Sequence, residues 1–315
     1  MKKVRVAVIG VGYLGRFHAQ KYAQLPECEL VAVVDSRPEA RAAVAAEVGA
    51  RALPDYRSLL GEVDAVSIVT PTAGHFAIAR EFLESGAHVL VEKPITETPQ
   101  QARELIQLAA KHGRVLQVGH LERFNSAIVG AEEHLRAPRF IECHRLAPYK
   151  ERGTDVSVVL DLMIHDIDIV QTLVGSAIES IDAVGTPVFS EDVDIANARI
   201  RFANGCVANA TASRVSLKTE RKMRVFSAEA YVSMDLQQKI VTVIRKRPGA
   251  VAGQLPVSIE ERNFEPGDAL QAEIQSFLGC IQHGTAPVVS GEAGLAALET
   301  AIQITAQVQK SRPLP

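Results

Sequence analysis

The stretch that decides the fold is VRVAVIGVGYLG, residues 4–15. The apolar run at its start predicts a buried strand, and three glycines follow it with the spacing G-x-G-x-x-G ahead of a predicted helix. In such a turn the first glycine allows the tight bend, the second lets the backbone approach a pyrophosphate, and the third lets helix and strand pack closely. The N–H groups at the helix start then favour the anion. We therefore predict a dinucleotide site that consists of Gly10, Gly12, Tyr13, Leu14 and Gly15.

An acidic residue follows this turn at the expected distance. Asp35 lies twenty residues after Gly15, at the end of the second predicted strand, where a carboxylate can bind the adenosine ribose hydroxyls. Asp35 would also repel a 2′-phosphate, which favours NAD over NADP. Arg37 keeps the alternative open, because its side chain could stack on adenine or bind such a phosphate. We expect NAD as the cofactor, with NADP as the alternative.

The first part of the chain alternates short apolar runs with helical segments. Strands are predicted over residues 4–9, 30–34, 64–69, 88–91 and 115–118, and helices over residues 15–23, 38–48, 77–85 and 99–112. Apolar runs without alternation are typical of parallel strands that are covered on both faces. Residues 1–120 are therefore predicted to form a doubly wound α/β domain.

The pattern changes near residue 120. A strand is predicted over residues 140–145, a helix over 157–173 and a strand-rich stretch over 178–245, with Asn204-Gly205 as a hairpin turn. Helices return at 269–283 and 293–308. We expect residues 121–315 to form an α+β domain with an open, mostly antiparallel sheet and one long helix against it. The C-terminal helices could pack back on the first domain.

Composition excludes several classes of partner. The chain has 315 residues with 34 basic and 37 acidic side chains, so no strong field favours nucleic acid or an anionic membrane. No stretch of about 18 apolar residues is present that could span a bilayer. Four cysteines are scattered singly, which argues against a zinc cluster and favours a reducing compartment. We expect a soluble, cytoplasmic protein without nucleic-acid or membrane partners.

The segment VVLDLMIHDIDIVQTLVG, residues 158–175, predicts a buried helix with a polar stripe. Its polar residues are spaced by four, three and four, so that they share one face: Asp161, His165, Asp168 and Thr172. Burying carboxylates and an imidazole costs several kcal/mol unless they are paired or line a wet cavity. The repeated acids favour a functional site, and the alternative is a structural network in which Asp161 only orients His165. No third ligand is evident for a metal, so none is expected.

A second candidate site is LVEKPI, residues 90–95. Glu92 and Lys93 follow an apolar strand of the predicted parallel sheet, and ligands collect at the carboxyl ends of such strands. Pro94 biases Lys93 towards an extended conformation. A solvated strand end is the alternative, but these arguments favour a lysine directed at a reacting group.

These motifs occur in a recognisable order: the glycine turn, TPTAGH (70–75), EKP (92–94) and DLMIHDID (161–168). Over essentially its whole length the sequence resembles the glucose–fructose oxidoreductase/inositol dehydrogenase (Gfo/Idh/MocA) family. The resemblance implies a Rossmann domain that binds NAD(P), a second domain that binds substrate, and a homodimer or homotetramer formed through the second domain's sheet.

The resemblance also assigns roles to single residues. Lys93 corresponds to the catalytic lysine, and Asp161 and His165 to the helix-borne pair, with His165 as the proton-transfer residue. These three would also contact substrate, and Lys93 would contact the cofactor as well. Glu92 corresponds to the acid beside the nicotinamide ribose, and the loop beside the cofactor corresponds to Thr70, Pro71 and His75.

A narrower resemblance lies in VGHLERFNSA, residues 118–127. It is similar to the subgroup of UDP-N-acetylglucosamine 3-dehydrogenases and related sugar-nucleotide enzymes, which carry GH-x-ERFN-P-A. Ser126 stands where proline is usual. The likeness places Glu122, Arg123 and Asn125 at the mouth of the substrate cleft. A solvated, salt-bridged helix start is the alternative.

The function implied is oxidation of a secondary hydroxyl of a sugar by an NAD(P)-dependent dehydrogenase. A nucleotide sugar such as UDP-N-acetylglucosamine is the first expectation, in amino-sugar or cell-envelope biosynthesis. A free sugar, inositol or another polyol is the alternative. A non-catalytic NAD-sensing regulator is the second alternative, and the joint presence of Lys93, Asp161 and His165 argues against it.

Overall fold

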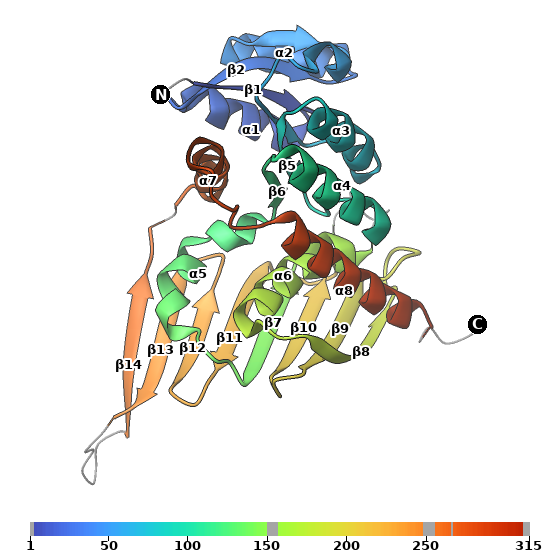
Figure 1. Cartoon of the computed structure of the whole chain (residues 1–315). Coiled ribbons are helices and arrows are strands. Elements are labelled where there is room, and N and C mark those ends of the chain that lie inside the picture. The colour runs from blue at the N-terminus through green and yellow to red at the C-terminus, as the bar shows by residue number, and fades with distance from the viewer. Residues whose placement is uncertain (1–2, 150–156, 248–255, 266, 311–315) are drawn as a thin grey trace. The chain divides into compact units, whose positions relative to one another are not determined.

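The chain folds into two units, each built on one β-sheet (Figure 1). The computed structural model describes residues 3–149, 157–247, 256–265 and 267–310. The first unit comprises Met1–Leu121 and Asp268–Ala296, and the second comprises Glu122–Gly267 and Ala297–Pro315. Each unit therefore consists of two separate stretches of chain.

The first unit holds a parallel sheet with the strand order β3-β2-β1-β4-β5-β6. Its strands are β1 (Val4–Ile9), β2 (Cys28–Val34), β3 (Arg51–Leu53), β4 (Ala65–Ile68), β5 (His88–Glu92) and β6 (Leu116–Gly119). Its helices are α1 (Tyr13–Gln24), α2 (Pro38–Val48), α3 (Thr72–Glu84), α4 (Pro99–His112) and α7 (Ala269–His283). The predicted doubly wound sheet is confirmed, and the strand order reverses direction between β1 and β4, where nucleotides bind in such folds.

The local pattern missed one strand of this unit, whereas helix α7 was predicted over its residues, with packing against the first domain as an expectation. The three-residue strand β3 has the sequence RAL, which is too short and too polar to stand out as an apolar run. Two of its three residues are exposed. Helix α7 comes from the far end of the chain, and its apolar residues Leu270, Ile274 and Phe277 pack into the same core as β1 and α1. The spacing of four and three residues aligns them on one helix face.

The second unit holds a sheet with the order β14-β13-β12-β11-β7-β10-β9-β8. Its strands are β7 (Phe140–Leu146), β8 (Ile178–Thr186), β9 (Ile195–Phe202), β10 (Val207–Ser213), β11 (Glu220–Phe226), β12 (Ala230–Asp235), β13 (Ile240–Lys246) and β14 (Val257–Asn263). Only the β7–β10 pair is parallel among these strands of the described residues, so the mostly antiparallel prediction is confirmed. The predicted hairpin joins β9 to β10, with Gly205 at φ +85°.

Three helices rather than one cover this sheet. They are α5 (Ser126–Ala131), α6 (Ile164–Val174) and α8 (Gly291–Lys310), of which α8 belongs to this unit from Ala297 onward. Figure 1 shows α6 and the end of α8 along one face of the sheet, and their apolar residues share one core with the strands. The opposite sheet face carries the outward residues of β7, β9, β11 and β12.

The helix predicted over residues 157–173 is interrupted at its start. Val159–Met163 form a π-helical turn, and the regular helix α6 begins only at Ile164. A π-turn admits an extra residue and rotates the helical residues after it, and such turns are frequent at functional sites. The predicted helix is present, but its first turn is π-helical rather than α-helical, and Asp166 and Asp168 are both buried.

Candidate functional site

The glycine turn has the geometry that its spacing predicts. Gly10 has φ +87°, and a Cβ there would lie 2.7 Å from the Val69 carbonyl oxygen. A Cβ on Gly15 would lie 1.9 Å from the Gly10 carbonyl oxygen, so neither position tolerates a side chain. A Cβ on Gly12 would meet only the Arg37 Nη2 atom at 3.6 Å among the described residues. The packing therefore does not require glycine at position 12, and the role of Gly12 in the approach of a pyrophosphate stays a prediction.

A cavity of about 460 Å³ lies beside this turn. Its lining includes three residues that the sequence assigns to the cofactor, Gly12, Tyr13 and Arg37. The exposed Tyr13 ring makes an edge-to-face contact with Phe17, which also lines the cavity, at 5.3 Å between centroids. Leu14 is half-buried behind them. A volume of this size accommodates a nucleoside, so the residues present fit the adenosine part of NAD.

Asp35 is held in place by the groups around it. Its carboxylate accepts hydrogen bonds from the Val11 N–H at 3.0 Å, from the Arg37 N–H at 2.9 Å and from the Arg37 guanidinium at 3.1 and 3.2 Å. Burial raises the pKa of Asp35, but the hydrogen bonds outweigh it and hold that pKa below its usual value. The ionised carboxylate of Asp35 neutralises the guanidinium of Arg37, which is the group that could otherwise bind a 2′-phosphate. The pair therefore favours NAD over NADP.

The EKP segment forms a turn that is tied to a neighbouring loop. The Lys93–Pro94 peptide bond is cis, and the half-buried Lys93 follows the last residue of β5. His75 is buried, with Nδ1 2.9 Å from the Pro94 carbonyl and Nε2 2.9 Å from the Thr70 carbonyl. Burial lowers the pKa of His75, although both carbonyls oppose the shift. His75 therefore joins the turn of Lys93 to the start of α3, where Pro71 precedes the first helical residue.

Glu92 connects Lys93 to the interior of the first unit. Its Oε2 atom accepts the Lys93 N–H at 3.3 Å, and its Oε1 atom lies 3.2 Å from His18 Nε2. A Cβ on the facing Gly119 would come within 2.8 Å of this carboxyl group, so the backbone of β6 closes one side of it. Neither His18 nor Gly119 was predicted as part of a site.

The polar stripe of the second unit divides into two parts. Asp161 lies in the π-turn and His165 in the first turn of α6, and both side chains are half-buried. Asp168 is buried, 3.5 Å from Arg123, and Arg123 also donates a hydrogen bond to Thr172. Asp168 and Thr172 thus contact Arg123, whereas Asp161 and His165 keep partial access to solvent.

Glu122 and Asn125 belong to a buried network of the second unit. Glu122 lies 3.4 Å from Arg145 and 3.0 Å from Arg221, and it accepts a hydrogen bond from Asn125 at 3.1 Å. Asn125 also caps α5 by accepting the Ala127 N–H at 3.1 Å. The alternative of a solvated, salt-bridged helix start is wrong on solvation, because the two residues are 8% and 3% exposed, but Glu122 is salt-bridged and Asn125 does begin a helix. Their contact with substrate stays a prediction, as does that of Arg123.

Arg145 and Asp166 are the residues of this network that the sequence did not reveal. The Arg145 guanidinium donates two hydrogen bonds to Asp166, at 2.8 and 2.9 Å, with both groups buried. Burial opposes its charge, but Asp166 and Glu122 together raise the pKa of Arg145. A buried arginine between two acids is stable only as a complete set, because removing one partner leaves an uncompensated charge.

Comparison with known proteins assigns both units. Residues 4–120 match the family model described as an oxidoreductase family with an NAD-binding Rossmann fold, and residues 131–233 match the GFO/IDH/MocA C-terminal domain. A UDP-N-acetylglucosamine 3-dehydrogenase from Acidithiobacillus ferrooxidans is 41% identical over 314 residues, which cover 98% of both chains. A solved structure of that enzyme superposes with a TM-score of 0.94 and covers 99% of this chain and 100% of its own.

More distant relatives share the fold. The scyllo-inositol 2-dehydrogenase (NAD(+)) of Bacillus subtilis is 28% identical over 99% of this chain and 96% of its own. A levoglucosan dehydrogenase solved in complex with NADH superposes with a TM-score of 0.86 at 19% identity, over 98% of each chain, which shows the fold alone. Among the helices of the described residues, none is both long and apolar enough to cross a membrane. The chain belongs to the Gfo/Idh/MocA family of NAD-binding oxidoreductases, and it is an NAD-dependent dehydrogenase.

Proposed function

We propose that the chain oxidises a secondary hydroxyl of a nucleotide sugar, namely the 3-hydroxyl of UDP-N-acetylglucosamine. The observation that carries this proposal is the 41% identity to a UDP-N-acetylglucosamine 3-dehydrogenase over 98% of both chains. Lys93, Asp161 and His165 are all present, as this chemistry requires. An inositol or another polyol is the second candidate, favoured by the match to the scyllo-inositol enzyme over 99% of this chain.

NAD supplies the two-electron acceptor when it is bound. Gly12 and the N-terminus of α1 bind its pyrophosphate, Asp35 binds the adenosine ribose, and Glu92 binds near the nicotinamide ribose. Each of these groups has a defined position in the first unit through the contacts described above. Thr70, Pro71 and His75 keep in place the loop that lies beside the bound cofactor.

The protein's own groups handle the substrate proton and charge. The ammonium group of Lys93 donates a hydrogen bond to the substrate hydroxyl oxygen and stabilises the negative charge that develops there. The neutral imidazole of His165 accepts the hydroxyl proton, and Asp161 orients the imidazole and favours its charged form. A proton-transfer group of this kind accelerates a reaction by about 10²–10⁴-fold.

A substrate panel tests this proposal. NADH formation is followed by absorbance with UDP-N-acetylglucosamine, scyllo-inositol and myo-inositol, each with NAD and with NADP. We expect turnover with the nucleotide sugar and NAD, and a keto product that mass spectrometry detects after capture by an aminotransferase. The proposal fails if an inositol is oxidised with the higher kcat/KM, or if the nucleotide sugar gives no product even when the product is removed.

We further propose a homodimer or homotetramer that forms through the open face of the second sheet. Three aromatic rings of β7, β11 and β12 lie together on this face, with Phe140–Phe226 centroids at 5.7 Å and Phe226–Tyr231 centroids at 4.7 Å. All three rings are half-buried in the single chain, and aromatic side chains are enriched at protein interfaces. Sedimentation velocity should show an oligomer that Phe226→Arg weakens, and a monomeric wild-type protein would contradict the proposal.

We also propose that the protein works in a reducing compartment such as the cytoplasm. All four cysteines, Cys28, Cys143, Cys206 and Cys280, are free and buried, and disulfides are rare where thiols are kept reduced.

A further inference from the structure

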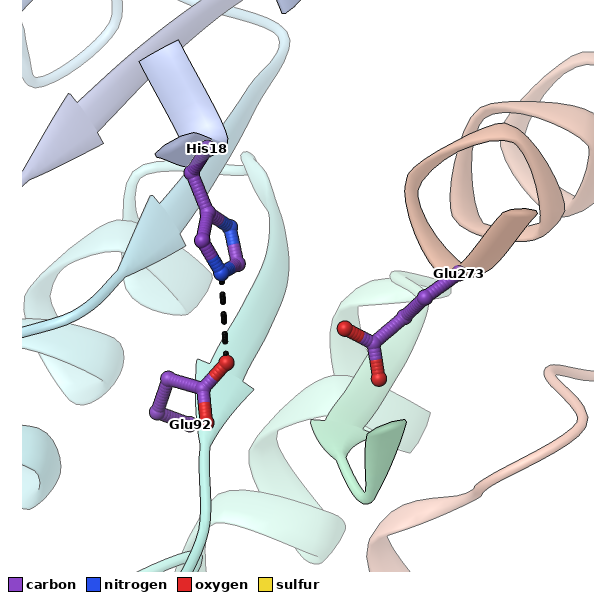
Figure 2. A group of neighbouring side chains, drawn as sticks. All are labelled: His18, Glu92 and Glu273. Carbon is purple, nitrogen blue, oxygen red and sulfur yellow. Dashed lines mark hydrogen bonds and ion pairs between the residues drawn. The ribbon is translucent and has the colours of Figure 1, made fainter. Parts of the chain in front are cut away.

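Three side chains of the first unit converge on one buried position behind Lys93. His18 comes from α1, Glu92 from the end of β5 and Glu273 from α7 (Figure 2). One nitrogen or oxygen atom of each side chain lies within 4.8 Å of the corresponding atoms of the other two. His18 and Glu273 are fully buried. The glycine turn, the polar stripe and the family resemblance assign no role to His18 or Glu273.

One side of this cluster is fully hydrogen-bonded. The Tyr22 hydroxyl lies 2.8 Å from Ser67 Oγ, which lies 3.3 Å from His18 Nδ1, and His18 Nε2 lies 3.2 Å from Glu92. Burial raises the pKa of Tyr22, which therefore keeps its proton. If Tyr22 donates to Ser67 and Ser67 to His18, the neutral imidazole donates its Nε2 proton to the Glu92 carboxylate.

The other side is a carboxyl group in an apolar setting. Neither carboxyl oxygen of Glu273 has a hydrogen-bond partner among the described residues, whereas its backbone carbonyl accepts a hydrogen bond from Gln117 at 3.1 Å. Figure 2 shows the Glu273 carboxyl group directed towards the His18–Glu92 pair. Burial raises the pKa of Glu273 well above its usual value, and the charge of Glu92 raises it further. The titratable groups around it are Glu92, His18 and Tyr22, and the charge that raises the pKa of Glu273 is that of Glu92.

We propose that Glu273 is a positioning residue which stays a neutral carboxylic acid, so that the Glu92–Glu273 pair holds one proton and one negative charge behind Lys93. His18 fixes the Oε1 side of Glu92, and Glu273 limits the charge at this position to one. Glu92 thereby presents a single negative charge to the cofactor while its Oε2 atom accepts the Lys93 N–H. The catalytic part of this inference rests on the proposed function, because it requires Glu92 to lie beside the nicotinamide ribose.

A cation in place of the proton is the competing explanation. Ligand atoms on a tetrahedral zinc ion lie about 3.4 Å apart, given bonds of about 2.0–2.2 Å. The three atoms are held only to within 4.8 Å of one another, which is a wider limit than the spacing of zinc ligands. His18 Nε2 and Glu92 Oε1 already form a hydrogen bond with each other. We therefore assign a proton. Metal analysis of the purified protein should find no stoichiometric divalent cation, and finding one would overturn the assignment.

The protonation state can be tested without any sugar substrate. At mildly alkaline pH, the infrared spectrum of the wild type should contain the C=O band of one protonated carboxyl group, and the spectrum of Glu273→Gln should lack it. The control variant Glu27→Gln, which changes an exposed glutamate, should retain this band. The folded state keeps a proton that the unfolded chain loses above about pH 4.3. Wild-type stability should therefore fall relative to Glu273→Gln as pH rises, by up to about tenfold in the unfolding constant per pH unit. Parallel pH curves and an unchanged band would refute the proposal.

The positioning role has its own measurement. Glu273→Gln keeps a neutral side chain of the same size, so the KM for NAD should stay within about twofold of wild type, whereas Glu273→Ala leaves a cavity beside Glu92 and should raise it by up to about tenfold. The KM for the sugar should not change in either variant. If Gln impairs NAD binding as much as Ala does, Glu273 is not neutral in the wild type. If Ala leaves the KM for NAD at the wild-type value, the role is also wrong. NAD titrations give this answer even if the sugar has been assigned wrongly.

Discussion

Replacing Lys93 by alanine should lower kcat for sugar oxidation at least about a hundredfold and leave NAD affinity within about twofold. The ammonium group is proposed to stabilise charge that appears on the substrate oxygen during the reaction, so its removal affects turnover far more than binding. Lys93 is half-buried and lies outside the helices and strands, directly after the last residue of β5. The fold should therefore tolerate the loss of its side chain. Steady-state kinetics with the nucleotide sugar and a separate titration with NAD measure the two effects.

The matched control is Lys111→Ala, which removes an exposed lysine from the last turn of α4 in the same unit. It should leave kcat and NAD affinity at wild-type values. Near-normal turnover of Lys93→Ala with its true substrate would remove Lys93 from the mechanism. A loss of NAD binding in that variant would instead assign Lys93 to the cofactor site alone.

Replacing His165 by alanine should slow turnover by about 10²–10⁴-fold, because the proton of the hydroxyl then has no base to accept it. The base must be neutral to act, so wild-type oxidation should increase as pH rises and the imidazole loses its proton. The variant should lose this increase. The rate measured across pH at saturating NAD gives both the magnitude and the shape.

His283→Ala is the control for this second variant, because His283 is an exposed histidine in the last turn of α7. It should leave the rate and its pH dependence unchanged. Asp161→Asn should reduce the rate less than His165→Ala does, since Asp161 acts through the imidazole. A His165→Ala variant that kept the wild-type pH dependence would show that another group is the base.

Local patterns predicted the parts of the site that depend on short stretches of chain. The glycine turn is determined within a few residues, because Gly10 and Gly15 are required by contacts with Val69 and with each other. The EKP turn follows directly from the end of β5. These features could be derived from residue order and the rules for parallel sheets.

Other parts depend on which elements the topology brings together. Arg145 meets Asp166 and Glu122 because β7, α6 and the turn at Leu121–Phe124 pack together, and no local pattern pairs them. Glu273 reaches Glu92 only because α7 joins the first unit. The π-turn before α6 is a local departure from the α-helix that helical periodicity alone cannot show.

The return of α7 to the first unit also affects how this protein can be divided. A gene fragment that ends at residue 121 would encode the parallel sheet without the helix whose Leu270, Ile274 and Phe277 cover part of its core. Such a fragment would expose that apolar surface to water and to other chains during synthesis. The first unit is therefore completed only after most of the second unit has been translated.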